Sequence, residues 1–206
     1  MKKKVYEVKS IEEAYPLAVE DLGIALCDIK FNTISEKKGF LGIGSKIEVE
    51  AYCDVDGVNK GKEYLQMILD NNGVEGFIEK KVRGNQVEFD IDCGEFNGYL
   101  IGKNARTLIA IQQLVTNVIN SYYDEDEKYV VLVDVNGYKK KREKRLERMA
   151  VDFGKEVART KQSIKLNDLN AYERKIIHNK LSSWKDVSTH SEGEEPNRYL
   201  IIEYKK

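Results

Sequence analysis

An arginine and a histidine stand four residues apart in the segment AYERKIIHNKL, in a chain that has only two histidines. A helix would place Arg174 and His178 on one face, because residues i and i+4 stack there. An arginine guanidinium forks onto a phosphate, and a histidine donates to a phosphate or stacks on a base. The spacing therefore suggests a phosphate grip. For a lone pair of this kind a structural role is the commoner one, with the arginine bound to loop carboxylates (Glu192, Glu194, Glu195) and the histidine bonded to backbone.

A second candidate site lies in YLIGKNARTL, where one helix ends and the next begins. Gly102-Lys103-Asn104-Ala105 would form a tight turn that leads into a helix N-terminus. The unpaired N–H groups and positive dipole end of a helix start suit a phosphate. Lys103 and Arg106 add full charges beside them. Helix starts with a glycine are common, so this turn alone is not specific.

The formal net charge of −1 conceals a strong asymmetry along the chain. Residues 53–136 carry 8 Lys and Arg against 15 Asp and Glu, whereas residues 137–181 carry 14 against 6. The basic segment opens with a helix that bears Lys139, Lys140, Lys141, Arg142, Lys144 and Arg145. An excess of this size indicates an anionic partner. A solvated helix face remains the plainer interpretation of an isolated basic run.

The elements that position these residues predict an α+β chain of three small domains. Residues 1–53 read as a βαββ-like unit, with strands near 5–10, 27–35 and 46–52 and a helix that Ser10 and Glu13 would open as a capping box. Residues 54–61, DVDGVNKG, are polar and turn-rich and read as a linker.

Residues 62–136 read as a compact α+β domain. We expect a helix over 62–70, a hairpin about Gly84-Asn85, a short helix, a long helix over 104–122 and a strand over 129–137. Residues 137–206 read as the long basic helix, a second helix from Asn170 to about Ser182, a loop over 185–198 and a final strand. The basic helix would bury a stripe of Tyr138, Leu146, Met149, Phe153 and Val157.

The segment LIGKNARTLIAIQQL resembles the L-I-G-[KR]-x-G-x-T-L-x-A-[LI]-Q segment of KH domains, and the element order over 62–136 matches their type II arrangement. The resemblance implies an RNA-binding loop of Gly102, Lys103, Asn104, Ala105 and Arg106, which would hold the backbone of about four single-stranded nucleotides. Ala105 replaces the second glycine of that loop. Its methyl group would crowd the RNA backbone, although a residue in ordinary helical conformation needs no glycine.

The segment LNAYERKIIHNKLSSWKDVSTHSEGEEPNRYLII resembles the domain named for its Arg-x-x-x-His pair, the R-three-H domain. Arg174 and His178 match the defining pair, Arg198 matches the basic residue after THSEGEEPN, and His190 lies in the matched loop. This resemblance implies binding of single-stranded nucleic acid.

An N-terminal unit with the loop KKGFLGIG, a KH domain and an R-three-H domain together resemble the Jag family, also called the KhpB or EloR family of bacterial RNA-binding proteins. The family resemblance implies a cytoplasmic RNA-binding regulator linked to a membrane insertase by gene neighbourhood and to cell-wall elongation and cell shape. It also implies single-stranded RNA, or single-stranded DNA, as a partner. A small KH-only protein, or a second copy joined through the KH domain, is the implied protein partner.

Two rival interpretations remain open. Two histidines could serve as acid and base in phosphoester cleavage, but no nucleophile motif or acidic metal cluster accompanies them, so we expect no catalysis, metal or cofactor. A protein-interaction adaptor is the stronger rival, because of the acidic middle segment, Ala105 and the apolar pair Phe40-Leu41. The apolar runs are too short for a membrane span and the start lacks a signal peptide, so we expect a cytoplasmic protein without membrane insertion.

Overall fold

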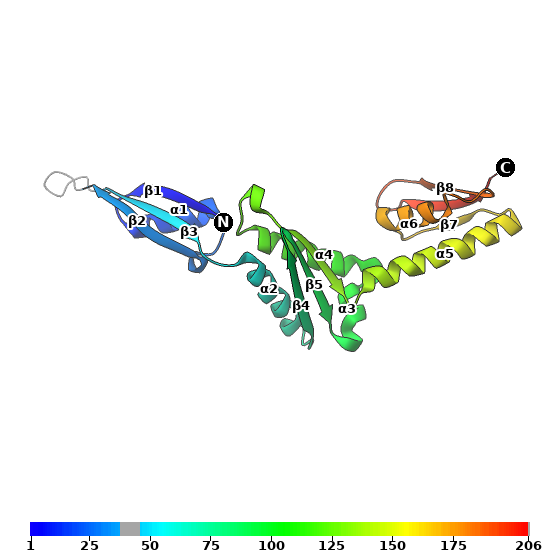
Figure 1. The fold of residues 1–206 in the computed structure, drawn as a ribbon, viewed down its shortest axis with the longest axis horizontal. Coiled ribbons are helices and arrows are strands. Elements are labelled where there is room, and N and C mark those ends of the chain that lie inside the picture. Colours follow the sequence, from blue (N-terminus) through cyan, green and yellow to red (C-terminus); the bar gives the residue numbers. More distant parts are fainter. Residues whose placement is uncertain (38–45, 206) are drawn as a thin grey trace. The chain divides into compact units, whose positions relative to one another are not determined.

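The computed structural model describes residues 1–37 and 46–205 (Figure 1). The loop KKGFLGIG from its second lysine onward, with Phe40-Leu41, lies outside the described residues. The chain forms two compact units, one of Met1–Phe96 and Leu108–Val133, the other of Asn97–Thr107 and Asp134–Lys206. Helices and three small three-stranded sheets alternate along it, so the expected α+β class is confirmed.

The first four main elements form the expected βαββ unit. Strands β1 (Lys3–Val8), β2 (Ile29–Lys37) and β3 (Lys46–Cys53) make an antiparallel sheet in the order β1-β3-β2, and helix α1 (Ile11–Leu22) packs on it (Figure 1). The capping box expected at Ser10 is wrong. The Ser10 side chain makes no cap bond, and Glu13 accepts instead from the backbone N–H of Lys9 at 2.9 Å.

The expected linker over residues 54–61 is wrong from Gly57 onward, because helix α2 (Gly57–Asn71) begins there. Asp56 caps it by accepting from the N–H groups of Val58 and Asn59. A Cβ at Gly57 would lie 2.7 Å from the Tyr123 ring. The glycine that suggested a turn instead lets the start of α2 approach the chain beyond helix α4 (Arg106–Asn120) closely.

The next elements follow the order expected for residues 62–136. Strands β4 (Phe77–Arg83) and β5 (Gln86–Asp92) form the antiparallel hairpin about Gly84-Asn85, and β6 (Val130–Val135) completes the sheet in the order β4-β5-β6. A short helix α3 (Asn97–Ile101) and the turn η4 (Lys103–Ala105) precede α4. The buried side chains include Leu65 and Leu69 of α2, Phe89 and Ile91 of β5, and Leu108, Ile111, Val115 and Ile119 of α4.

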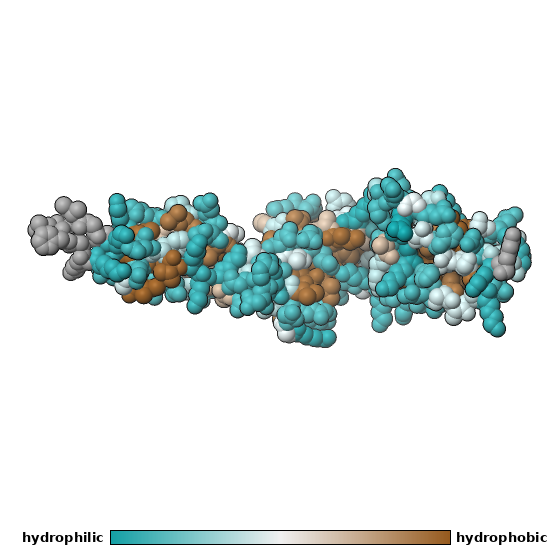
Figure 2. Space-filling view, turned by 90° about the horizontal axis from the view of Figure 1, so that it is seen from above, coloured by the Kyte–Doolittle hydropathy of each residue, from teal (hydrophilic) through white to brown (hydrophobic). Residues whose placement is uncertain are grey.

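The C-terminal elements are α5 (Tyr138–Thr160), β7 (Ile164–Leu166), α6 (Ala171–Leu181), β8 (Val187–Glu192) and β9 (Tyr199–Tyr204). The strands form an antiparallel sheet in the order β7-β9-β8. Both helices contribute to one core with the sheet, made of Leu146, Ala150, Val157, Leu169, Ile177, Leu181, Val187, Leu200 and Ile202. Outside this core the surface seen in Figure 2 is mostly hydrophilic over these elements.

Two sequence expectations for this region are corrected. The segment expected to be a loop over 185–198 contains strand β8, and β7 was not predicted. In helix α5, Ala150 and Gly154 are buried, whereas Tyr138, Met149 and Phe153 of the expected stripe are only partly buried. A Cβ at Gly154 would lie 2.8 Å from Leu181, so small residues allow α5 and α6 to approach closely.

Candidate nucleic-acid interface

Helix α6 places Arg174 and His178 one turn apart, as expected. A reciprocal capping box fixes its start: the Glu173 N–H donates to Asn170 Oδ1 at 2.9 Å, and the Asn170 N–H donates to Glu173 Oε2 at 3.0 Å. This cap satisfies two otherwise unpaired backbone donors. It also holds the Glu173 carboxylate against the helix start, where it is only 4% exposed.

Arg174 is buried, with 6% of its surface exposed. Its Nη1 donates to the Leu169 carbonyl at 2.8 Å and its Nη2 donates to Glu195 Oε1 at 2.6 Å. The Glu195 side chain is 61% exposed and lies in the connection between β8 and β9. The guanidinium is therefore bound to a loop carboxylate, and an anion from solution reaches its Nη2 only where Glu195 moves aside.

His178 is exposed, and its Nδ1 lies 2.6 Å from Thr189 Oγ1 on β8. His190 follows Thr189 directly, so its side chain points to the other face of the sheet. There its Nε2 lies 3.0 Å from Glu192 and its Nδ1 3.4 Å from Glu203. The structure thus brings His178 and Arg174 together on α6 but not His190.

The β8–β9 strands and their connection carry further charged groups. The hydrogen bond with His190, followed by the one from the Tyr199 hydroxyl, holds the pKa of the Glu192 carboxyl below its usual range. Arg198 is exposed and lies in the same β8–β9 connection as Glu195.

The six basic residues at the start of α5 divide into two kinds. Arg142 Nε donates to buried Glu173 at 2.8 Å, and Lys141 Nζ donates to the carbonyl and side chain of Asn136 at 2.7 and 2.8 Å. Lys139 is not free either, and its backbone N–H donates to Asp134 Oδ1 at 3.2 Å. Among the described residues, the exposed side chains of Lys140, Lys144 and Arg145 form no ion pair. We call these three residues the α5 stripe.

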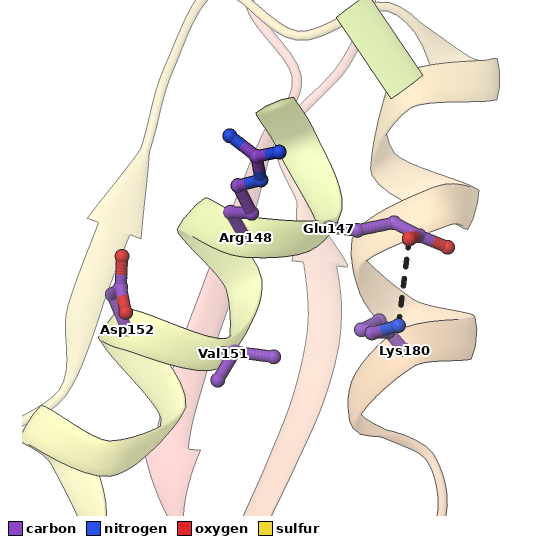
Figure 3. Close-up of a pocket in the computed structure, with 5 residues that line it drawn as sticks. All are labelled: Glu147, Arg148, Val151, Asp152 and Lys180. Carbon is purple, nitrogen blue, oxygen red and sulfur yellow. Dashed lines mark ion pairs between the residues drawn. The ribbon is translucent and has the colours of Figure 1, made fainter. Parts of the chain in front are cut away.

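A groove of about 330 Å³ follows the seam between α5 and α6 (Figure 3). Its lining combines two cations, two carboxylates and one valine: Glu147, Arg148, Val151, Asp152 and Lys180. Lys180 Nζ lies 3.4 Å from Glu147 Oε2, and Arg148 projects away from that pair. The balanced charges leave no excess field for an anion in the groove, so the α5 stripe is the better candidate.

The turn before α4 has an unusual backbone. Gly102, Asn104 and Ala105 have φ values of 69°, 53° and 59°. A Cβ at Gly102 would lie 2.8 Å from the Thr107 Cβ, so only glycine fits there. The possibility that Ala105 adopts an ordinary helical conformation is wrong, and α4 consequently begins at Arg106 rather than at Asn104. Lys103 and Arg106 are exposed beside this helix start.

The part of the chain that the structure describes holds no group of three or more His, Cys, Asp or Glu side chains that could bind a metal ion. Within those same residues, no helix is both long and apolar enough to cross a membrane.

The fold and the site define an α+β protein with an R-three-H domain, whose family matches residues 144–204. The chain is 34% identical to RNA-binding protein KhpB of Clostridium symbiosum over 202 residues, which cover 96% of this chain and 90% of that protein. It is 32% identical to RNA-binding protein KhpB of Bacillus subtilis (strain 168) over 203 residues, 96% of each. RNA-binding protein KhpB of Streptococcus pneumoniae serotype 2 matches at 30% over 158 residues, 76% of this chain and 47% of that longer protein. The chain belongs to the KhpB family, also called the Jag family.

Proposed function

We propose that this chain binds single-stranded RNA through its phosphates and acts as an RNA-binding regulator that makes and breaks no bonds. The α5 stripe carries the proposal, because Lys140, Lys144 and Arg145 are exposed cations without an ion-pair partner among the described residues. When such cations neutralise phosphates, counterions condensed on the nucleic acid are released, and this release favours binding. The relatives' name, RNA-binding protein, supports the same ligand.

The turn from Gly102 to Arg106 is the second proposed contact. It belongs to the same compact unit as α5 and α6. The helix start that follows it and the exposed side chains of Lys103 and Arg106 suit a phosphate. We assign residues 62–136, with the first helix extended back to Gly57, to a type II KH domain.

The remaining assignments complete this proposal. Residues 137–206 act as the R-three-H domain, in which Arg174, His178 and Arg198 contact the RNA strand. Residues 1–53 act as the N-terminal domain. His190 lies on the opposite sheet face, so it would contact a different part of the RNA. The proposed setting is the cytoplasm, in the control of cell elongation and cell-wall growth that the family resemblance implies.

Fluorescence anisotropy of a labelled single-stranded RNA with the full chain tests this function. Asn104→Asp puts a carboxylate in the turn while keeping the side-chain shape, and aspartate tolerates the left-handed backbone. We expect the affinity to fall about tenfold relative to Asn85→Asp, which makes the same change in the β4–β5 turn. Wild-type protein that binds single-stranded RNA no better than an acidic control protein in dilute buffer would refute the function. Equal affinities for the two variants would refute the role of the turn.

A protein-interaction adaptor is the second candidate, favoured by the binding of Arg174 to Glu195 rather than to solvent. Its partner would be a small KH-only protein, a second copy through the KH domain, or a factor linked to the membrane insertase or cell shape. Affinity for such a partner, dominated by apolar burial, would change little with salt, whereas RNA affinity would fall steeply. Light scattering of the purified chain, alone and with the KH-only protein, checks this alternative.

A further inference from the structure

The ion pair between Arg174 and Glu195 is strongly asymmetric. Arg174 is 6% exposed and is held by the α6 backbone and by the Leu169 carbonyl, whereas the Glu195 side chain is 61% exposed. A buried cation cannot lose its anion without a large cost, but an exposed carboxylate on a strand connection can move into water cheaply. The weaker-held member of the pair is therefore the carboxylate.

We propose that Glu195 is a built-in competitor for RNA, whose carboxylate occupies the place of a phosphate on Arg174 until a strand displaces it. The inference rests on the proposed RNA binding. Carboxylate and phosphate oxygens are equivalent acceptors for a guanidinium. Exchange of one for the other keeps Arg174 neutralised throughout, so the phosphate enters without leaving a buried charge unpaired.

The neighbouring charges fit this exchange. Arg198 lies three residues beyond Glu195 in the same connection, and His178 lies one turn along α6 from Arg174. Both side chains are cationic or hydrogen-bonding groups that would supply further donors to the phosphates of a bound strand. The resident carboxylate lowers the apparent RNA affinity by the fraction of molecules in which it is bound. Strands that offer only one phosphate would therefore compete poorly against it.

Glu195→Gln tests the competition, because it keeps the side-chain shape and removes the charge. Glu194→Gln is the matched control: it lies next to Glu195, is exposed, forms no ion pair among the described residues, and changes the net charge equally. With a labelled single-stranded RNA we expect Glu195→Gln to bind about fivefold tighter than Glu194→Gln. In an Arg174→Gln background, which removes the cation that both anions would bind, this difference should disappear.

Thermal unfolding with inorganic phosphate provides a second measurement that needs no RNA. Phosphate should raise the Tm of Glu195→Gln more than that of Glu194→Gln, since the vacated guanidinium binds it in the folded state only. Equal RNA affinities of the two variants, with wild-type binding intact, would overturn the competition but not the proposed function. A Glu195→Gln variant that binds RNA more weakly and that phosphate does not stabilise would show a purely structural pair. If wild-type protein bound no RNA, the proposed function would fail, and the phosphate measurement would still decide whether Arg174 exchanges its anion.

Discussion

At the scale of single residues, the identity of the residue decides how much backbone strain the turn before α4 carries. Gly102 and Ala105 both have positive φ, but only Gly102 is the residue type that adopts this conformation without strain. The left-handed region costs an L-residue about 1 to 2 kcal/mol. Ala105 therefore stores strain at the position where a phosphate-binding loop would have glycine.

Replacing Ala105 by glycine should stabilise the protein. The relief of left-handed strain exceeds the extra entropy that glycine loses on folding, so we expect the free energy of unfolding to rise by about 0.5 to 1 kcal/mol. Urea unfolding followed by circular dichroism measures it. Ala110→Gly, in the exposed interior of α4, should instead cost about 1 kcal/mol. Destabilisation by both changes would mean that Ala105 is not strained.

At the scale of elements, the cations at the start of helix α5 have two different roles. Arg142 ties α5 to the start of α6 through Glu173, whose second oxygen already serves the capping box. The side chains of the α5 stripe are exposed to solvent. Arg142 thus contributes to stability, and the α5 stripe contributes to the proposed RNA contact.

Arg142→Met should distinguish the contribution to stability from the contribution to RNA binding. It leaves the buried Glu173 carboxylate without its ion-pair partner, so we expect the free energy of unfolding to fall by about 1 to 3 kcal/mol. Trp184, the single tryptophan, packs on the core of α5 and α6, so its fluorescence in urea reports this loss. Arg145→Met should leave stability within about 0.5 kcal/mol of wild type and weaken RNA binding. The reverse pattern would contradict the division.

Sequence patterns predicted most elements but not these roles. The 3.6-residue periodicity of α4 and the alternation in β3 and β5 depend on local residue order, so they were predicted correctly. Strand β8 was missed because VSTHSE has few apolar side chains. It forms a strand because it pairs with β9. The contact of Arg174 with Glu195 spans 21 residues, and the sequence left it as one of several alternatives. No local pattern distinguishes Arg142, which is bound to Glu173, from Arg145, which is exposed.

At the scale of the whole molecule, buried charge and exposed charge act differently. Asp28 is 8% exposed, and it accepts from the Tyr122 hydroxyl at 2.9 Å and pairs with Lys60 Nζ at 2.9 Å. These contacts join the turn before β2, the start of α2 and the chain beyond α4. Burial opposes ionisation, but the hydrogen bonds from Lys60 and Tyr122 together outweigh it and hold the pKa of the Asp28 carboxyl below its usual range.

Asp28→Asn should therefore destabilise the protein in a pH-dependent way. A lowered folded-state pKa contributes stability above the unfolded pKa of about 3.9, and this contribution is lost as pH falls through the folded value. We expect a loss of about 1 to 3 kcal/mol at pH 7 that shrinks as the pH is lowered toward 3. Urea unfolding by circular dichroism at both pH values measures it. Asp54→Asn, which breaks the exposed pair with Lys30, should cost far less, and an equal cost would contradict the role of burial.

Exposed charge should govern RNA affinity through its position rather than through the total. The chain as a whole carries −1, so a uniform polyanion attraction is excluded and the α5 stripe must act locally. Log affinity should fall linearly with log salt, and each lost phosphate contact on a single strand should reduce the slope by about 0.7. We expect Lys140→Gln with Lys144→Gln to reduce it by about 1.4. Lys3→Gln with Lys9→Gln removes the same charge from exposed positions near β1 and should leave the slope unchanged. Anisotropy titrations from 50 to about 300 mM salt give both slopes, and equal effects of the two double variants would mean that RNA responds only to net charge.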